Sequence, residues 1–177
     1  MPNYRRRWCP GGTYFFTVNL LKRENNDLLV RHIALLREVT RSVRQRHPFT
    51  IHAWVVLPNH MHCVIELPPG DINYALRWRL IKGGFSKLLP TDEWRSKTRA
   101  ARQERGIWQR RYWEHMVRDE ADFLSHVDYV HLNPLKHGLV ATVSEWPYST
   151  FHQWVRRGVY PPTWAGREES DPTRRAP

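Results

Sequence analysis

The stretch at 56–65, which reads VLPNHMHCVI, constrains the fold most. Two short apolar runs meet at Pro58-Asn59, which predicts two strands joined by a tight antiparallel turn. Side chains alternate along a strand, so His60 and His62 share one face and Met61 points to the other. Two imidazoles on one face are a candidate pair of metal ligands, although such a pair alone is weak evidence.

The rest of the chain supplies the elements that such a hairpin needs. We expect strands at 13–20, 50–57, 61–67 and 112–118, a helix from Asn26 or Asp27 to about Arg46, a helix capped by Asp71 that ends near residue 89, a helix capped by Asp119 that Pro134 stops, and a short helix within 147–157. This order predicts an α+β fold, a ferredoxin-like antiparallel sheet of about four strands with helices on one face.

The length of 177 residues indicates one domain, divided into a basic N-terminal arm at 1–12, a catalytic domain at 13–157 and a loosely ordered tail at 158–177. Within the domain, 91–107 reads as a mobile basic loop. No apolar run approaches the ~18 residues that a membrane span requires. With no secretory signal and only Cys9 and Cys63 as cysteines, the chain is expected in the cytoplasm.

The charge of the chain points to a polyanion partner, nucleic acid before membrane. The net charge is +11, the pI is about 10.3, and residues 77–118 hold twelve Lys or Arg against four Asp or Glu. Several of the nine tryptophans lie beside arginines, as in a surface that holds phosphates and stacks on unpaired bases. The candidate nucleic-acid-binding residues are Arg5, Arg6, Arg7, Arg77, Arg79, Lys82, Lys87, Arg110 and Arg111.

The helix predicted at 119–133 carries a polar stripe beside its apolar one. Phe123, Val127 and Val130 form the buried stripe, and Tyr129 and Asn133 lie one turn apart on the flank. A tyrosine at a helix edge is usually only a boundary residue. Its phenolate is nevertheless a competent nucleophile, and a nearby divalent cation would favour that form.

The two candidate pairs complement each other. A metal held by His60, His62 and the amide oxygen of Asn133 would lie next to Tyr129 and keep positions open for substrate. Nitrogen and oxygen ligands without a thiolate suit Mg²⁺ or Mn²⁺, which assist the cleavage of phosphate esters. We therefore predict that Tyr129 is catalytic and that His60, His62 and Asn133 are metal ligands.

These residues, with the segments around them, resemble the REP-associated tyrosine transposases, a branch of the single-tyrosine transposases that carry a His-hydrophobic-His motif. The matching segments lie in chain order between about 4 and 155: YRR, GGTYFFTVNL, LPNHMH, WQRRYWEH, YVHLNPLKHGLV and WPYS. One departure is Met61, since Val is more usual between the histidines. A second departure is Asn133, since related transposases have Gln at the corresponding place.

The resemblance implies a ferredoxin-like enzyme that cleaves single-stranded DNA. Tyr129 would attack the scissile phosphate, form a 5′-phosphotyrosine and leave a 3′-OH, which allows strands to be rejoined. The implied substrates are repeated extragenic palindromes, DNA hairpins with a single-stranded foot, in the bacterial nucleoid. The resemblance favours a monomer over a dimer.

Two other functions fit parts of the sequence. A non-catalytic nucleic-acid-binding domain of the same fold would keep the charge but lose the adduct chemistry. A zinc hydrolase of small molecules conflicts with the charge of +11 and lacks a glutamate close to the histidine pair. The remaining histidines have plainer interpretations: His131 points away from Tyr129, His115 sits on the sheet, His137 meets helix-end carbonyls, and His52 is a satisfied surface residue.

Overall fold

The computed structural model describes residues 9–91, 93 and 95–165, so the predicted contacts Arg5, Arg6 and Arg7 lie outside the described residues. The elements in chain order are β1 (Thr13–Asn19), α1 (Leu28–Arg31), α2 (Ile33–Arg46), β2 (Thr50–Val56), β3 (His60–Glu66), α3 (Tyr74–Leu88), α4 (Lys97–Ala101), β4 (Trp113–Met116), α5 (Glu120–Lys136), a 3-10 turn (Val143–Glu145) and α6 (Phe151–Arg156).

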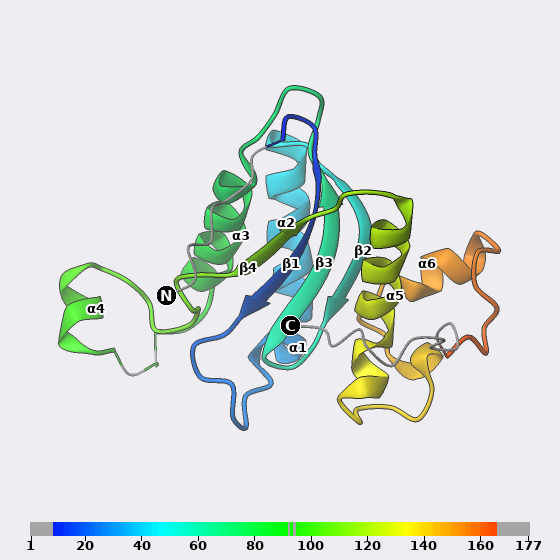
Figure 1. The fold of residues 1–177 in the computed structure, drawn as a ribbon. Helices are drawn as coiled ribbons and strands as arrows, with labels where there is room; N and C mark the ends of the chain where they lie inside the picture. Colours follow the sequence, from blue (N-terminus) through cyan, green and yellow to red (C-terminus); the bar gives the residue numbers. More distant parts are fainter. Residues whose placement is uncertain (1–8, 92, 94, 166–177) are drawn as a thin grey trace, which may run out of the picture.

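The four strands form one antiparallel sheet in the order β2-β3-β1-β4 (Figure 1). The predicted hairpin of β2 and β3 is confirmed, and its turn is closed by the Leu57 amide, which donates to the His60 carbonyl at 2.9 Å. β1 and β3 pair in the centre, with Asn19 opposite His60 and Thr17 opposite His62. The fold class is therefore confirmed as α+β with the strand order of a ferredoxin-like sheet.

The helices cover both faces of the sheet, which corrects the prediction of helices on one face. Tyr14, Phe16 and Val18 of β1 pack with residues of α2 and α3 in the larger core. The alternate residue Phe15 packs instead with Val127 and other residues of α5 in a second core. Figure 1 shows α2 and α3 on one side of the strands and α5 on the other. The two long helices within the βαββαβ unit, α2 and α3, share a face, and α5 follows that unit.

Helix ends differ from the prediction where the capping residue was ambiguous. The first predicted helix is interrupted at His32 and forms α1 and α2. α3 is capped by Asn73, whose side chain accepts from the Leu76 amide, and not by Asp71. Asp71 accepts from the Asn73 amide at 2.6 Å, so it orders the turn before the cap. Residues 91–107, expected to be a loop, include the short helix α4.

Pro134 does not stop α5, which continues to Lys136. Pro134 has no amide to donate to the preceding turn, but the helical hydrogen bonds resume after it, since the His137 amide donates to the Asn133 carbonyl at 3.0 Å. Gly138, at φ +65°, then ends the helix: its amide donates to Leu135 and the Leu139 amide donates to Pro134, as in a Schellman motif. This termination places His137 directly after the last turn.

The segment after α6 is packed in part, although loose order was expected from Gly158 onward. Tyr160 is buried, and its hydroxyl donates to the Asp128 carboxylate at 2.5 Å. Its ring stacks on Trp164 with the ring centroids 4.3 Å apart. The predicted tail beyond residue 165 lies outside the described residues. Within the described residues, no helix is both long and apolar enough to span a membrane.

Candidate active site

His60 and His62 lie on β3 and face α5, as the alternation of the strand predicted. Each side chain is buried, with 4% of the residue exposed. Their ring centroids are 4.9 Å apart and the rings are perpendicular. The opposite face of β3, with Met61 and Cys63, belongs to the larger core. The structure therefore presents two adjacent imidazoles to the helix on the other side.

The hydrogen bonds of these rings determine which nitrogens remain for a ligand. Asn59 donates through Nδ2 to the Arg23 carbonyl at 2.6 Å, so its Oδ1 faces His60 Nδ1, 2.6 Å away. Because an amide oxygen only accepts, His60 Nδ1 carries the proton and Nε2 carries the lone pair. His62 Nδ1 is similarly occupied by the Thr17 hydroxyl at 2.8 Å. Outer partners of this kind fix the orientation of metal-binding histidines.

The environment of the pair keeps both rings neutral. Burial lowers the pKa of His60 to about 3, and the charges of Arg23 and His137 add to this effect. Burial also lowers the pKa of His62 to about 3, reinforced by the neighbouring His60 and His137, while a hydrogen bond with Asn133 opposes it. A neutral imidazole is the form that binds a metal ion.

Tyr129 and Asn133 reach the pair from α5. Asp119 caps this helix as predicted, accepting from the Asp122 amide at 2.8 Å, while Val127 and Val130 are fully buried against the sheet. The predicted third member of the apolar stripe, Phe123, is only half-buried. Packing of this stripe turns the flank with Tyr129 and Asn133 toward β3.

The nucleophile candidate and the third ligand candidate both touch the histidine pair. The Tyr129 ring lies edge-on to His62 with the centroids 5.3 Å apart. Asn133 is 1% exposed, and its Nδ2 donates to the Tyr129 carbonyl at 2.8 Å, which turns Oδ1 away from the helix backbone. Two imidazoles and the side-chain amide of Asn133, which hydrogen-bonds to His62, thus lie next to the phenol ring of Tyr129. This donor set fits Mg²⁺ or Mn²⁺.

Three further residues at this site were not identified from the sequence. Phe15 lies between the elements, with ring contacts to His62 at 5.7 Å and to Tyr129 at 5.7 Å. Lys136 places its Nζ 5.2 Å from the centre of the Tyr129 ring. His137, expected only at helix-end carbonyls, also has its ring 5.0 Å from that of His60. His137 stands four residues after Asn133, a helical spacing that could have revealed it.

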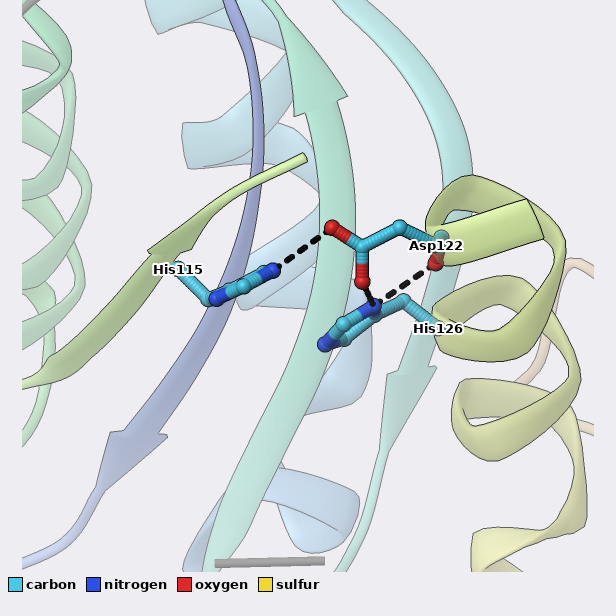
Figure 2. A group of neighbouring side chains, drawn as sticks. All are labelled: His115, Asp122 and His126. Carbon is cyan, nitrogen blue, oxygen red and sulfur yellow. Dashed lines mark hydrogen bonds and ion pairs between the residues drawn. The ribbon is translucent and has the colours of Figure 1, made fainter. Parts of the chain in front are cut away.

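A second cluster on the same face joins β4 to the start of α5 (Figure 2). His115 Nε2 lies 2.8 Å from Asp122 Oδ2, and His126 Nδ1 lies 2.8 Å from the Asp122 carbonyl oxygen. The Arg118 amide and guanidinium also donate to Oδ2, and these partners hold the pKa of Asp122 at about 2 despite its burial. We call these three residues, His115, Asp122 and His126, the β4–α5 cluster. His115 was expected only to sit on the sheet.

The ligand atoms of the β4–α5 cluster lie within 4.8 Å of one another, which is close enough for one cation. The rings argue against that use, because they are stacked at 4.6 Å with planes only 17° apart. A metal ion lies near the plane of each imidazole that binds it, and stacked planes do not meet at a common point nearby. Both histidines are also hydrogen-bonded to Asp122. The arrangement favours a structural role, in which hydrogen bonds connect β4 to α5.

Two other histidines follow their predicted roles. His131 is fully buried, and its Nε2 lies 2.9 Å from the Thr150 hydroxyl, so it is no ligand of the candidate site. His52 Nε2 pairs with the Glu66 carboxylate at 2.8 Å. Neither of these two histidines is therefore part of the candidate site.

The predicted DNA contact at Arg77 is wrong. Arg77 is 2% exposed, and its guanidinium donates to the carbonyls of Pro48 and Asn73 and to the Asp71 carboxylate. Lys82 is also occupied, since its Nζ donates to the Gln109 carbonyl at 2.6 Å. Burial lowers the pKa of Lys82 to about 8. Arg77 and Lys82 therefore stabilise the fold. The sequence cannot show this, because most of the groups that accept their hydrogen bonds are backbone carbonyls.

The other predicted DNA contacts on described residues remain predictions. Arg79, Lys87, Arg110 and Arg111 are exposed, and Arg110 pairs with Glu104 at 2.9 Å. Arg79 and Lys87 belong to α3, which packs on the face of the sheet opposite to His60 and His62. Trp78 and Trp108, expected to interleave with the arginines, are buried in the core and cannot stack on bases.

Comparisons with known proteins give the family of the chain. The family model described as "Transposase IS200 like" matches residues 14–133, which include both histidines, Tyr129 and Asn133. The chain is 47% identical over 166 residues to the REP-associated tyrosine transposase of Escherichia coli K12, covering 94% of this chain and 92% of that protein. It is 41% identical over 170 residues to a putative REP-associated tyrosine transposase of Haemophilus influenzae, covering 96% of each.

A solved structure of a REP-associated tyrosine transposase bound to a REP hairpin is also similar. Its TM-score is 0.80 at 46% identity, and the match covers 94% of this chain and 93% of that one. The fold, the family match and the near full-length relatives therefore agree. The chain belongs to the IS200-like transposase family and, within it, to the REP-associated tyrosine transposases, enzymes that cleave DNA and transfer strands.

Proposed function

We propose that this chain is a metal-dependent single-stranded DNA endonuclease and strand-transferase that acts on palindromic hairpin DNA. The observation that carries the proposal is the contact of Tyr129, on α5, with His62, on β3, beside the buried Asn133. A hairpin substrate is supported by the similar structure, which is described as bound to a REP hairpin. The net charge of +11 suits such a partner.

In the proposed reaction, the Tyr129 oxygen attacks the scissile phosphorus and the bond to the 3′ oxygen breaks. The DNA is left joined to Tyr129 through its 5′ phosphate, and the phenol proton is balanced by the proton that the released 3′-OH takes up. A 3′-OH can later reverse the attack, which rejoins or transfers the strand. His60, His62 and Asn133 would hold Mg²⁺ or Mn²⁺, which when bound withdraws charge from the phosphate oxygens.

The chain's own residues supply the positioning in this proposal. Thr17 and Asn59 hold the imidazoles in one orientation, and Asn133 is fixed by its bond to the Tyr129 carbonyl. Phe15 packs its apolar ring against both His62 and Tyr129. Prealigned groups lower the entropic part of the barrier.

A covalent adduct tests the proposal. The protein is incubated with a hairpin oligonucleotide that has a single-stranded foot, with Mg²⁺ or Mn²⁺, and is then separated under denaturing conditions. Wild type and the control Tyr148→Phe are expected to form a protein–DNA adduct, whereas Tyr129→Phe binds the hairpin but forms none. Binding without an adduct in either metal would favour the non-catalytic alternative. Adduct formation by Tyr129→Phe would exclude Tyr129 as the nucleophile.

We further propose that the working unit is a monomer acting on chromosomal DNA in a bacterial cytoplasm. Tyr129 and the histidine pair meet within a single chain, so no partner is needed to complete the site. A mixture of Tyr129→Phe and His62→Ala proteins is therefore expected to stay inactive. Recovery of adduct formation in the mixture would show that two chains share each site.

A further inference from the structure

The end of β1 carries one more polar side chain on the face of the histidine pair. In the β1–β3 register Thr17 stands opposite His62 and Asn19 stands opposite His60. The Thr17 hydroxyl bonds to His62 across the strands, which shows that this face of β1 points into the site. Cβ atoms of directly opposed residues are about 4.5–5.5 Å apart. Asn19 is therefore an immediate neighbour of His60.

The amide oxygen of Asn19 has no partner among the described residues. Its Oδ1 is buried and accepts no hydrogen bond there. The ring nitrogen that could have donated to it, His60 Nδ1, is already used by Asn59. A buried acceptor without a partner costs about 1–3 kcal/mol, so it is uncommon in a folded protein and calls for an explanation.

Backbone hydrogen bonds at Asn19 and at the next residue fix the main chain from which the Asn19 side chain extends. The Gln109 amide donates to the Asn19 carbonyl at 3.1 Å, and the Leu20 amide donates to the Asn59 carbonyl at 2.9 Å. Groups that bind a ligand work best on such rigid elements. An unpartnered oxygen kept in place in this way is suited to receive something that the polypeptide does not supply.

The neighbouring atoms indicate what that is. His60 Nδ1 carries the proton, so the free nitrogen of His60 offers a lone pair, and Asn19 Oδ1 offers another. Two neighbouring acceptors do not satisfy each other, but both can bind a cation. An amide oxygen is a hard ligand of the kind that Mg²⁺ and Mn²⁺ prefer.

We propose that Asn19 is a further ligand of the divalent cation that His60, His62 and Asn133 would hold. This inference rests on the proposed function, since it adds an oxygen to that metal site. Two imidazoles and two amide oxygens would leave a six-coordinate ion with positions open for phosphate oxygens. The ligands of the metal ion would then come from β1, β3 and α5.

Manganese affinity of the full chain without DNA tests the assignment, measured by the electron paramagnetic resonance signal of free Mn²⁺. Wild type is expected to bind one ion, and His62→Ala to lose it. Asn19→Leu removes the oxygen and is expected to weaken the affinity about tenfold or more, the range seen even for residues that act through a ligand. Asn19→Asp keeps an oxygen and adds charge, so it should bind Mn²⁺ at least as tightly as wild type.

Asn26→Ala is the matched control, because its oxygen already accepts from the Leu28 amide, and it should bind as wild type does. Equal Mn²⁺ affinity in wild type and Asn19→Leu, with loss in His62→Ala, would overturn the role of Asn19 and leave the proposed metal site standing. Unchanged Mn²⁺ affinity with weaker hairpin binding would also overturn it and make Asn19 a DNA contact. Failure of wild type to bind Mn²⁺, even with hairpin present, would remove the metal site and this ligand together. If Asn19→Leu does not fold, weaker binding by Asn19→Asp would contradict the assignment.

Discussion

Thr17 holds one ring nitrogen of His62, and the same ring also hydrogen-bonds to Asn133. The Thr17 hydroxyl lies 2.8 Å from His62 Nδ1 and reaches it across two paired strands. Val has the shape of Thr without the hydroxyl, so Thr17→Val would leave His62 in place but free to rotate. We expect Mn²⁺ affinity to fall roughly 10- to 100-fold, with hairpin affinity little changed.

Thr13→Val is the control for this change, because Thr13 lies on the same face of β1 but opposite Glu66. Both variants are compared in the same Mn²⁺ titration. An unchanged affinity in Thr17→Val would mean that packing alone orients His62.

Local sequence predicted the residues whose positions depend on one element. The alternation of β3 gave His60 and His62 a common face, and the helical period of α5 placed Tyr129 beside Asn133. Thr17 and Asn19 were out of reach, because their positions beside His62 and His60 depend on the register between strands, which no local pattern states. Asn59 was missed because its orientation depends on the carbonyl of Arg23, which lies far from it in the sequence. Arg77 was misassigned because the backbone carbonyls that bind it come from separate segments.

The β4–α5 cluster fixes the position of the start of α5 relative to β4. His115 and Asp122 are seven residues apart and close the β4–α5 connection, and His126 packs on Phe15, which also contacts Tyr129. His115→Leu would release the start of α5 and shift Tyr129 relative to His62. Since misplacement by about 1 Å can cost 10²-fold in rate, we expect cleavage at saturating hairpin to slow by roughly that order.

Hairpin affinity and the melting temperature separate this effect from general unfolding. His115→Gln keeps a donor for Asp122 and should recover most of the cleavage rate. A His115→Leu enzyme that cleaves at the wild-type rate would show that the apolar packing of α5 positions Tyr129 without the cluster.

Two adjacent glycines in α3 provide a test of the α2–α3 contact. A Cβ at Gly84 would lie 2.8 Å from a methyl of Val39, whereas a Cβ at Gly83 would meet no atom within 4 Å. Ala is better than Gly in a helix by about 0.8–1 kcal/mol. Gly83→Ala should therefore stabilise the protein by up to about that amount.

Gly84→Ala should destabilise it, because overpacking of a core costs about 1–3 kcal/mol. Urea unfolding of the two variants beside wild type measures both free energies. Stabilisation by both substitutions would contradict the close approach of the two helices.

The order of the helices and strands was predicted better than the residues at which they end or the face of the sheet that each helix covers. The order of strands and helices followed from apolar periods, but the cap of α3 is Asn73 and not Asp71, and both residue types are good caps. Pro134 was taken as a stop, but the helix continues for two residues beyond it. The face covered by α5 could not be read from its own sequence, because Val127 and Val130 fit either side of a sheet equally well.

The molecule as a whole carries a built-in sensitivity to acid. Burial lowers the pKa of His60, His62 and His131 to about 3 each, from an ordinary value of 6.5. Between these values the unfolded chain binds protons that the folded chain does not, so stability present above pH 6.5 is lost as the pH falls toward 3. We expect the free energy of unfolding in urea to decrease steadily across this window.

His131→Gln tests the contribution of one histidine away from the candidate site. The amide of Gln can still donate to Thr150 but does not titrate. The free energy of unfolding should therefore depend less steeply on pH, by the equivalent of one bound proton. An unchanged slope would mean that His131 does not stay neutral in the folded protein.

The most direct test of the whole account is the chemical identity of the protein–DNA link. An oligonucleotide that traps the adduct is reacted with the protein, the complex is digested, and the modified peptide is sequenced by mass spectrometry. The account predicts a nucleotide joined through its 5′ phosphate to Tyr129, in the peptide that also contains Asn133, with a free 3′-OH on the released strand. A link to another residue, or through a 3′ phosphate, would contradict it.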